Sequence, residues 1–524
     1  MTKPPDLDDA RLAVRCTSEV IDAAIASAKR FGPSIDTQQN FLYDLSHAAA
    51  GLSMCRTALE HARAGDQQAH LAMVFIGRVV AQLGATLWTA HHAWGVRPDA
   101  LEPARTFAAS ATSGAYVAAA AALTPPSGLS DELELVAETF RRFGEDKIAP
   151  YAERIHREDL DIPLEIIEGV ADLGCFGLSI SEEYGGSAKG DEDDYLAMII
   201  ATEELSRVSL GAGGSLITRP EILARALESG GTDAQKRAWL PGIASGETLC
   251  AVAVTEPDFG SDVSRVNVTA APVEAGYLVN GTKTWCTFAG QANALMLLAR
   301  TDADPTAGHR GLSLLVIEKP SDDGHHFRHE ARGGTLEGRA IPTLGYRGMH
   351  SFEVNFSDWF VPETHLIGGS DGLGRGFYLQ MAGFENGRIQ TAARSVGLMQ
   401  RAYELARTYA ADRRVFDRTL DEYELTQSKL GTMLALIAVS RQHTYKVARS
   451  LATGAGATEA AMAKAFMCKA AEWVTRESMQ IHGGYGYAEE FEVSRLFVDA
   501  RVLSIFEGTD ETLCLKLIAR ELLS

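Results

Sequence analysis

The sequence predicts a multidomain α+β protein in which helical regions flank one antiparallel β domain. Apolar residues recur at helical spacing through 1–123, 130–246 and 376–523, whereas residues 248–362 alternate and are rich in Val, Thr and Leu. A chain of 524 residues is too long for a single hydrophobic core. We therefore expect four domains, namely a helical extension at 1–124, a helical domain at 125–247, a β domain at 248–370 and a four-helix bundle at 371–524.

The first 123 residues carry the boundary signals of a small helical bundle. Acidic residues begin the helical segments and glycines end them, as helix termini favour. The predicted starts are Asp6, Asp36, Asp66 and Asp99, and the predicted stops are Gly32, Gly65 and Gly95. The run TPPSG at 124–128 predicts a linker. Helical spacing then returns from Ser130 to Gly246, with glycine-rich interruptions at 183–189 and 211–214.

The middle of the chain predicts strands without intervening helices, which indicates an antiparallel sheet. The expected strands are 248–256, 266–274, 276–285, 294–301, 311–319 and 352–362. Turn residues separate them at Glu274-Ala275-Gly276 and at Asn280-Gly281, and the Asn-Gly dipeptide predicts a tight hairpin. Beyond Gly376 the helical segments are long and their connections short, which predicts an antiparallel bundle. These segments are 376–412, 422–453, 456–482 and 511–523.

Composition narrows the class of function. The net charge of −20 argues against nucleic acid and against anionic membrane surfaces as partners. The seven cysteines are scattered and form no CxxC pair, so we expect no disulfide framework, no metal site and a cytoplasmic location. The start of the chain lacks a secretory signal, and charge such as Arg78 interrupts the longest apolar stretches, so we expect no membrane span. No Rossmann or P-loop glycine pattern is found.

Two stretches of the β region are candidates for ligand binding. In VAVTEPDFGSDV (252–263), Thr255 ends a strand, and a loop then presents the hydroxyl of Ser261 and free backbone N–H groups to an anionic or carbonyl-rich ligand. A plain strand-to-strand turn is the alternative. In NGTKTWCT (280–287), Trp285 and Thr287 are two apart in a strand and should share a face. They could hold a flat heterocycle, or Trp285 could be a core residue.

Two C-terminal stretches are also candidates. In QIHGGYGY (480–487), Gly483 and Gly484 allow a ligand to approach the backbone, although a tight turn would need the same residues. In SIFEGTDE (504–511), the carboxylate of Glu507 follows an apolar run and precedes a predicted helix start at Thr509. Glu507 is either a solvated residue near a helix N-terminus or a base that faces a cofactor pocket.

Taken in order, VAVTEPDFGSDV, NGTKTWCT, DRRVFDR (412–418), QIHGGYGY and IFEGTDE resemble the acyl-CoA dehydrogenase family over roughly residues 130–524. Five separated motifs in family order make the resemblance specific. It implies a helical domain, a middle β domain and a C-terminal four-helix bundle, with FAD as cofactor. It also implies a homodimer or homotetramer, acyl-CoA as substrate and an electron-transferring flavoprotein as acceptor.

The resemblance assigns roles residue by residue. Glu507 matches the base that removes the α-proton while a β-hydride passes to flavin N5. Arg388 and Ser261 match residues near the acyl-CoA, and Ser261 also lies near the FAD phosphates in the family. The remaining FAD contacts implied are Val254, Thr255, Trp285, Thr287, Arg413, Phe416, Gln480, Gly483, Gly484, Thr509 and Glu511, of which Arg413 and Phe416 would reach the FAD of a neighbouring subunit.

The chain departs from the family pattern at a few positions. Asp417 and Glu424 stand where relatives often have Gly and Gln, and Phe506 replaces a Tyr that often precedes the base. One subfamily carries its base directly before the Arg of the first bundle helix. That position is Gly387 here, which leaves Glu507 as the base.

Further strings point to a substrate with a second carboxylate. The extension at 1–124 and the strings GGSLITRPEILARAL (213–227) and AGFENGRIQTAAR (382–394) are similar to family members that convert (2S)-methylsuccinyl-CoA to mesaconyl-CoA in the ethylmalonyl-CoA pathway. A buried carboxylate needs a cation, and Arg219 is our candidate. The alternative is that Arg219 pairs with Glu221 or Glu204. The alternative functions are another short-chain or glutaryl-type dehydrogenase, an acyl-CoA oxidase, or an inactive helical scaffold.

Overall fold

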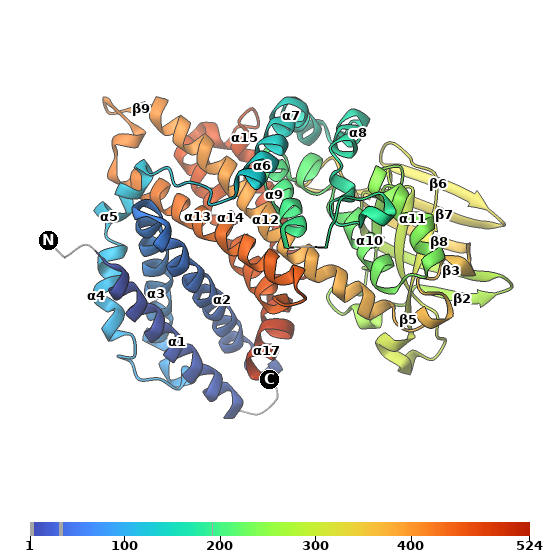
Figure 1. Ribbon diagram of the computed structural model, residues 1–524, viewed down its shortest axis with the longest axis horizontal. Coiled ribbons are helices and arrows are strands. Elements are labelled where there is room, and N and C mark those ends of the chain that lie inside the picture. The colour runs from blue at the N-terminus through green and yellow to red at the C-terminus, as the bar shows by residue number, and fades with distance from the viewer. Residues whose placement is uncertain (1–4, 31–34, 191) are drawn as a thin grey trace. The chain divides into compact units, whose positions relative to one another are not determined.

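The computed structural model describes residues 5–30, 35–190 and 192–524. The chain folds into two compact units. We call residues 1–134 and 391–524 the bundle unit, and residues 135–390 the sheet unit. Each is described by itself below (Figure 1).

The bundle unit is mainly helical and combines both ends of the chain. Its N-terminal helices are α1 (Leu7–Arg30), α2 (Gln39–His61), α3 (Asp66–Trp94), α4 (Glu102–Ala111) and α5 (Gly114–Ala119). Its C-terminal helices are the second half of α12 (Gly376–Asp412), then α13 (Glu424–Ala452), α14 (Ala457–His482), α15 (Glu492–Leu503), α16 (Asp510–Thr512), a π-helical turn (Leu513–Ile518) and α17 (Ala519–Leu523). A short hairpin, β9 (Arg414–Val415) and β10 (Arg418–Thr419), joins α12 to α13.

The N-terminal helices share one core with the C-terminal helices, as the adjacent blue and orange ribbons of Figure 1 show. The ring of Phe75 on α3 lies 5.6 Å from that of Phe466 on α14. Gly431 of α13 packs so tightly that an added Cβ would lie 2.0 Å from the carbonyl oxygen of Val117 on α5. Removing water from apolar surface is the main stabilising term in such packing. The extension is therefore part of the bundle's core and is not a separate appendage.

Two helices begin about one turn later than the sequence predicts. Helix α2 begins at Gln39, after a 3₁₀ turn that contains Asp36, and α4 begins at Glu102 instead of Asp99. Gly95 ends α3 in the left-handed conformation at φ 66°, as expected. Gly65 caps the start of α3, and Gly32 lies outside the described residues. Helix α15 was not predicted as a helix of its own.

One helix among the described residues, α3, is long and apolar enough by length and composition to cross a membrane. The expectation that no segment has this property is therefore wrong. The interior of the bundle unit buries 61 % of the apolar window of α3, so the helix packs as a core element. All seven cysteines are buried and free, in line with the expectation of no disulfide.

The sheet unit places helices before its sheet in sequence. The helices are α6 (Asp131–Phe143, which starts in the bundle unit), α7 (Ala149–Glu158), α8 (Leu164–Asp172), α9 (Glu192–Val208), α10 (Thr218–Gly230) and α11 (Asp233–Ser245). Thr232 and Gln235 form a reciprocal capping box at the start of α11. Residues Leu210–Gly214 form a buried π-helical turn where the glycines predicted a break. The absence of side chains allows this close packing, since a Cβ on Gly211 would lie 2.2 Å from the carbonyl oxygen of Arg347.

Eight strands form one curled sheet. They are β1 (Cys250–Ala253), β2 (Thr269–Val273), β3 (Gly276–Thr287), β4 (Ala294–Arg300), β5 (Leu312–Glu318), β6 (His326–Ala331), β7 (Gly334–Ile341) and β8 (Ser351–Pro362). The order is β1-β4-β2-β3-β8-β7-β6, with β5 paired to β4. Most pairs are antiparallel, but β4 pairs in parallel with β1 and β2, and the hairpin β6–β7 was not predicted.

The predicted hairpin at Asn280-Gly281 is wrong, because both residues lie inside β3. The other predicted turn, at Glu274-Ala275-Gly276, is confirmed, because the chain turns there between β2 and β3. Gly281, at φ 125°, occupies a bulge opposite β8, where a Cβ would lie 2.9 Å from Val268. The side chain of Asn280 exchanges two hydrogen bonds of 2.9 Å with Asp358 of β8. Residues that favour a positive φ thus serve a bulge here and not a turn.

Candidate active site

The segment between α15 and α16 in the bundle unit carries Glu507 on a strained backbone. Glu507 has φ 54° and Gly508 has φ 92°. The left-handed region costs a residue with a Cβ roughly 1–2 kcal/mol, and such strain is concentrated at functional sites. Thr509 then caps α16, because its Oγ1 accepts the backbone N–H of Thr512 at 3.2 Å. The helix start predicted at Thr509 is present.

The carboxylate of Glu507 is half-buried, and its Oε2 atom is buried with no hydrogen-bond partner among the described residues. Buried polar atoms are normally satisfied, so an unpartnered carboxylate oxygen needs a reason. A fully solvated loop residue would not have such an atom. The structure therefore favours the second of the two readings of Glu507, in which the carboxylate serves a ligand.

Buried cations contact the residues on either side of Glu507. Lys464 of α14 is 1 % exposed and donates to the carbonyl oxygen of Gly508 at 2.7 Å. The guanidinium of Arg394 on α12 lies 5.3 Å from the centroid of the Phe506 ring. The first contact holds the main chain after Glu507 and the second holds the ring before it. Neither could be read from the sequence, because Lys464 and Arg394 lie far from Glu507 along the chain.

A second group in the bundle unit joins the β9–β10 hairpin to the turn that follows α14. The guanidinium of Arg413 lies 5.9 Å from the centroid of the Tyr485 ring. Gly483 and Gly484 are exposed, and a Cβ on either would meet nothing within 4 Å. The Phe416 side chain is 88 % exposed. Arg413 and Tyr485 thus place a cation and an aromatic ring beside open backbone, and Tyr485 is an addition that the sequence did not single out.

Three other predicted FAD contacts, Gln480, Thr509 and Glu511, also belong to the bundle unit. Gln480 is exposed at the end of α14, Thr509 is half-buried and Glu511 is exposed beside the base segment. Asp417 has φ 65°, in the left-handed region that glycine adopts without strain. Aspartate tolerates the left-handed region better than most residues, so the hairpin retains its shape.

In the sheet unit, a buried ion pair holds the loop that carries Val254, Thr255 and Ser261. The Lys283 Nζ atom, which is fully buried, lies 2.9 Å from Glu256 Oε1 and donates to the carbonyl oxygen of Val254 at 2.8 Å. Burial lowers the pKa of Lys283, and the charge of Glu256 opposes this shift. Each Glu256 oxygen also accepts a backbone N–H, from Asn267 at 2.7 Å or from Val268 at 2.8 Å.

The same loop lies against β3, where Trp285 and Thr287 lie. The backbone N–H of Thr284 donates to the carbonyl oxygen of Thr255 at 2.8 Å. Trp285 is 55 % exposed at φ 57°, within a register shift between Lys283 and Cys286. This bulge breaks the strict alternation, so the argument that Trp285 and Thr287 share a face does not hold. Thr287 is buried, and its Oγ1 lies 2.9 Å from Ser351 Oγ.

Helix α10 of the sheet unit carries the candidate cation. Arg219 is 6 % exposed, and its Nη1 is buried with no hydrogen-bond partner among the described residues. Glu221 instead pairs with Arg225 at 3.4 Å and accepts hydrogen bonds from Gln390 and Asn386. Glu204 pairs with Arg141 at 2.7 Å. Neither of the two expected carboxylate partners is therefore paired with Arg219 in the described residues.

Glu221, Arg388 and Ser261 are the other polar residues of the sheet unit that bear on the predicted site. Burial raises the pKa of Glu221, although Arg225 opposes this shift. Arg388 of α12 is 8 % exposed, so it is a second buried guanidinium of this unit. Ser261 is exposed on the loop that Glu256 organises. The structure places Ser261 and Arg388 in one unit and leaves their predicted roles as predictions.

Comparison with known proteins assigns the family. Residues 130–247, 251–359 and 374–523 match the N-terminal, middle and C-terminal domains of acyl-CoA dehydrogenase, respectively. The chain belongs to the acyl-CoA dehydrogenase family. It is therefore a flavin-dependent oxidoreductase that acts on CH–CH bonds, with FAD as cofactor and an acyl-CoA as substrate.

Individual acyl-CoA dehydrogenases resemble the chain over about three quarters of its length. It is 42 % identical over 399 residues to (2S)-methylsuccinyl-CoA dehydrogenase of Cereibacter sphaeroides, covering 76 % of this chain and 70 % of that protein. Butyryl-CoA dehydrogenase of Megasphaera elsdenii superposes with a TM-score of 0.69 at 30 % identity, over 76 % of this chain and 99 % of that one. A glutaryl-coenzyme A dehydrogenase in complex with glutaryl-CoA gives 0.68 at 30 % identity, over 75 % and 95 %.

The residues present fit FAD in each unit. In the sheet unit, the exposed indole of Trp285 offers a flat apolar surface, which suits a flavin ring. In the bundle unit, the open space at Gly483 and Gly484 allows a ligand to reach the backbone, and Arg413 supplies a positive charge near it. The contacts that we predict for individual residues remain predictions.

Proposed function

We propose that the protein catalyses α,β-dehydrogenation of a short branched dicarboxylic acyl-CoA, with (2S)-methylsuccinyl-CoA as substrate and mesaconyl-CoA as product. The observation that carries the proposed chemistry is Glu507, a carboxylate on a strained backbone whose buried oxygen has no hydrogen-bond partner in the described part of the chain. The substrate is supported by the 42 % identity to the Cereibacter sphaeroides enzyme and by the buried guanidinium of Arg219.

In the proposed reaction Glu507 removes the α-proton of the thioester. The Cα–H bond breaks, the proton goes to Oε2 of Glu507, and its electron pair forms the Cα=Cβ bond as a hydride leaves Cβ. FAD supplies the hydride acceptor when it is bound. A carboxylate oxygen that accepts no hydrogen bond from the described residues keeps its lone pairs for the C–H proton. The contacts of Lys464 with Gly508 and of Arg394 with Phe506 hold the residues on either side of Glu507.

We assign FAD to the residues named from the family pattern. Trp285 and Thr287 would hold the ring, with Val254, Thr255 and Ser261 on the loop fixed by Glu256. Arg413, Gln480, Gly483, Gly484, Thr509 and Glu511 would contact the rest of FAD. The exposure of Phe416, at 88 %, fits a residue that a neighbouring subunit covers, as in a homodimer or homotetramer.

Glu507→Gln tests the assignment of the base. The variant keeps the shape of the side chain and removes its basicity, so we expect it to bind FAD and to lose at least about 10²-fold in turnover. Exchange of the α-proton of the acyl-CoA with D₂O, followed by NMR under anaerobic conditions, measures the base step without oxidation of the substrate. Glu521→Gln, an exposed carboxylate of α17 to which no role in binding is assigned, is the matched control. Full exchange in Glu507→Gln would refute the assignment.

Arg219 is our candidate for the second carboxylate of the substrate. A buried guanidinium with an unpartnered nitrogen can offer a charge-assisted hydrogen bond that is not already used by Glu204 or Glu221. Arg388, also buried, is assigned to the acyl-CoA, together with Ser261. A buried carboxylate without such a partner would be costly, so the cation should decide between dicarboxylic and neutral substrates.

Arg219→Met tests this assignment through a ratio of two rates. We expect kcat/KM for methylsuccinyl-CoA to fall by roughly 10²-fold or more relative to a neutral branched acyl-CoA, as the loss of a charged hydrogen bond predicts. Arg225→Met removes a guanidinium from the same helix that Glu221 already pairs, so it should leave the ratio unchanged. Equal losses on both substrates in Arg219→Met would exclude the role.

The electron acceptor in our proposal is an electron-transferring flavoprotein. Turnover with such a flavoprotein should exceed turnover with oxygen by a wide margin. A faster reaction with oxygen would make the protein an oxidase of the same fold. Size measurement in solution should show a dimer or a tetramer.

A further inference from the structure

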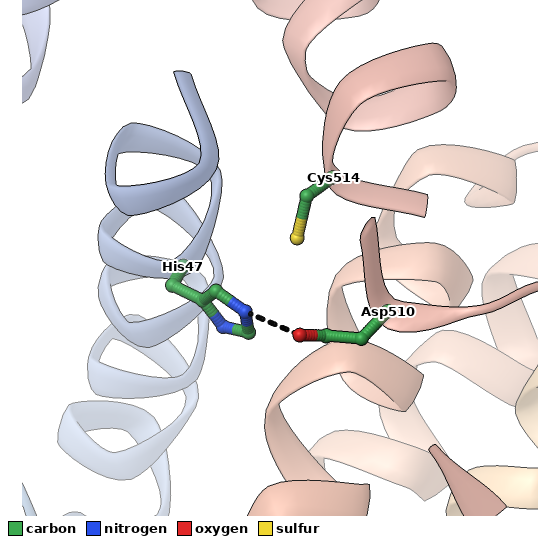
Figure 2. A group of neighbouring side chains, drawn as sticks. All are labelled: His47, Asp510 and Cys514. Atoms are coloured by element: carbon green, nitrogen blue, oxygen red, sulfur yellow. Dashed lines mark hydrogen bonds and ion pairs between the residues drawn. The ribbon is translucent and has the colours of Figure 1, made fainter. Parts of the chain in front are cut away.

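The N-terminal bundle contacts the segment that carries Glu507. Helix α2 places Tyr43 and His47 one turn apart, and both side chains meet Asp510, the first residue of α16. Figure 2 shows the His47 ring directed from α2 at the Asp510 carboxylate, with Cys514 beside them. The Tyr43 hydroxyl donates to Asp510 Oδ2, and the His47 Nε2 atom lies 3.1 Å from the same oxygen.

A lysine completes this cluster. Lys469 of α14 lies 3.2 Å from Asp510 Oδ2, donates to the Tyr43 hydroxyl and sits 4.6 Å from the centroid of the Tyr43 ring. Burial raises the pKa of Asp510, but the hydrogen bonds and charges of His47, Tyr43 and Lys469 outweigh burial and hold the pKa of this carboxyl well below its usual range. Asp510 is 6 % exposed, so its charge is held largely out of water.

The spacing of His47, Asp510 and Cys514 would also suit a metal ion. The ammonium of Lys469 already faces the Asp510 oxygen that a metal would need, and the tyrosine hydroxyl donates to it as well. Two cations at one carboxylate oxygen repel each other. The observations therefore favour a hydrogen-bonded clamp over a metal site.

The base segment is held on its other sides by residues of the C-terminal helices. Lys464 holds the carbonyl of Gly508, and Ser504 donates to Glu472 of α14. These contacts use residues inside the region that matches the family, which begins at residue 130. Tyr43 and His47 lie outside that region, so they are an addition to the shared catalytic core.

We propose that Tyr43 and His47 are positioning residues for the base, and that helix α2 thereby makes the N-terminal extension a working part of the active site. Asp510 is three residues from Glu507, and the intervening Gly508 and Thr509 form the cap of α16. A fixed Asp510 fixes the start of α16, which in turn holds Glu507 in its left-handed backbone conformation. The proposal rests on Glu507 being the base, as proposed above.

The test compares substitutions in α2 that differ only in their contact with Asp510. The double variant Tyr43→Phe with His47→Leu removes both hydrogen bonds from α2 to Asp510. We expect kcat and kcat/KM to fall together by about 10- to 100-fold, because a small displacement of a catalytic group slows the reaction. Tyr43→Phe with His47→Gln keeps one donor and should recover most of the loss. Thr57→Val removes a buried hydrogen bond of 2.8 Å from α2 to His443 and touches no residue of 504–512, so it is the matched control.

Two measurements separate positioning from general destabilisation. Amide hydrogen exchange in segment 504–513 should speed up in the double variant and not in Thr57→Val, measured on the FAD-loaded protein. The α-proton exchange in D₂O should slow in the double variant in step with kcat. If the double variant exchanges, turns over and protects 504–513 like the unsubstituted protein, the proposal is wrong.

The outcome also distinguishes this proposal from the assignment of the base. Loss of α-proton exchange in Glu507→Gln, with unchanged activity in the α2 double variant, leaves the base in place and removes only the role of α2. Retained exchange in Glu507→Gln removes the base itself. If the double variant and Thr57→Val lose FAD or stability to the same extent and lose the same activity, the positioning role is excluded, because a structural role alone explains the loss.

Discussion

The buried pair Lys283–Glu256 offers the sharpest test of how the sheet unit holds the loop that carries its predicted flavin contacts. Lys283→Met leaves the Glu256 carboxylate buried at 6 % exposure with two backbone donors and no cation. Removing one member of a buried ion pair destabilises a protein by about 3–5 kcal/mol, because an uncompensated charge stays behind. The loop 254–268, which carries the predicted flavin contacts, should loosen at the same time.

The expected magnitudes follow from the contacts. Lys283→Met and Glu256→Gln should each lower the free energy of unfolding by about 3–5 kcal/mol, which corresponds to a fall in the unfolding temperature of the order of 10 °C. The pair Lys283→Met with Glu256→Gln removes both charges, so it should lose less than the sum of the single variants. Urea unfolding of the three variants measures the coupling.

The flavin readout uses a matched control. Lys319 is a second buried lysine of the sheet unit, 3.0 Å from Asp322, and it does not contact loop 254–268. Lys319→Met should therefore destabilise the unit without lowering the fraction of protein that retains FAD through gel filtration, whereas Lys283→Met should lower both. Additive single variants, or equal flavin loss in Lys283→Met and Lys319→Met, would refute the reasoning.

Two further predictions concern pH and the backbone at the base. Burial lowers the pKa of His443 to about 4, so the unfolded state takes up a proton at higher pH than the folded state does. The contribution of this residue to stability is therefore full above about pH 6.5 and falls as the pH drops towards 4. Relative to His443→Asn, the protein should lose about 3 kcal/mol over that range in urea unfolding, and identical slopes would contradict the shift. Gly508→Ala, at φ 92° with Leu513 3.1 Å from the new Cβ, should lower stability by about 1–3 kcal/mol and turnover as well, and unchanged kinetics would show that the turn does not position Glu507.

The fold was largely predictable because its signals are local. Helical spacing and alternation over long segments identified the helices of both ends and the β region, and five motifs in order identified the family. The errors lie where a local signal served another purpose. Asn280-Gly281 formed a bulge, because pairing of β3 with β8 outweighs the local preference of this dipeptide for a turn.

The site was predictable only in part, since its chemistry rests on contacts between distant residues. The sequence could place Glu507 after an apolar run, but not the bond from Lys464 to Gly508, which joins positions 44 residues apart. It offered Glu221 and Glu204 as partners of Arg219, and each is occupied by another cation. Hydrogen-bond partners far apart in sequence can be found only once the fold is known.

The shared core explains why the role of α2 has to be tested by point substitutions. Deleting residues 1–124 would remove Phe75 from the face of α14 and Val117 from the groove at Gly431, leaving apolar helix faces of the C-terminal bundle exposed to water. A truncated chain would then lose activity because its bundle no longer packs, whether or not Tyr43 and His47 orient the base. Substitutions of Tyr43 and His47 keep the packing of α2 and change only its contact with Asp510. A loss of turnover in these variants therefore reports on the orientation of Glu507.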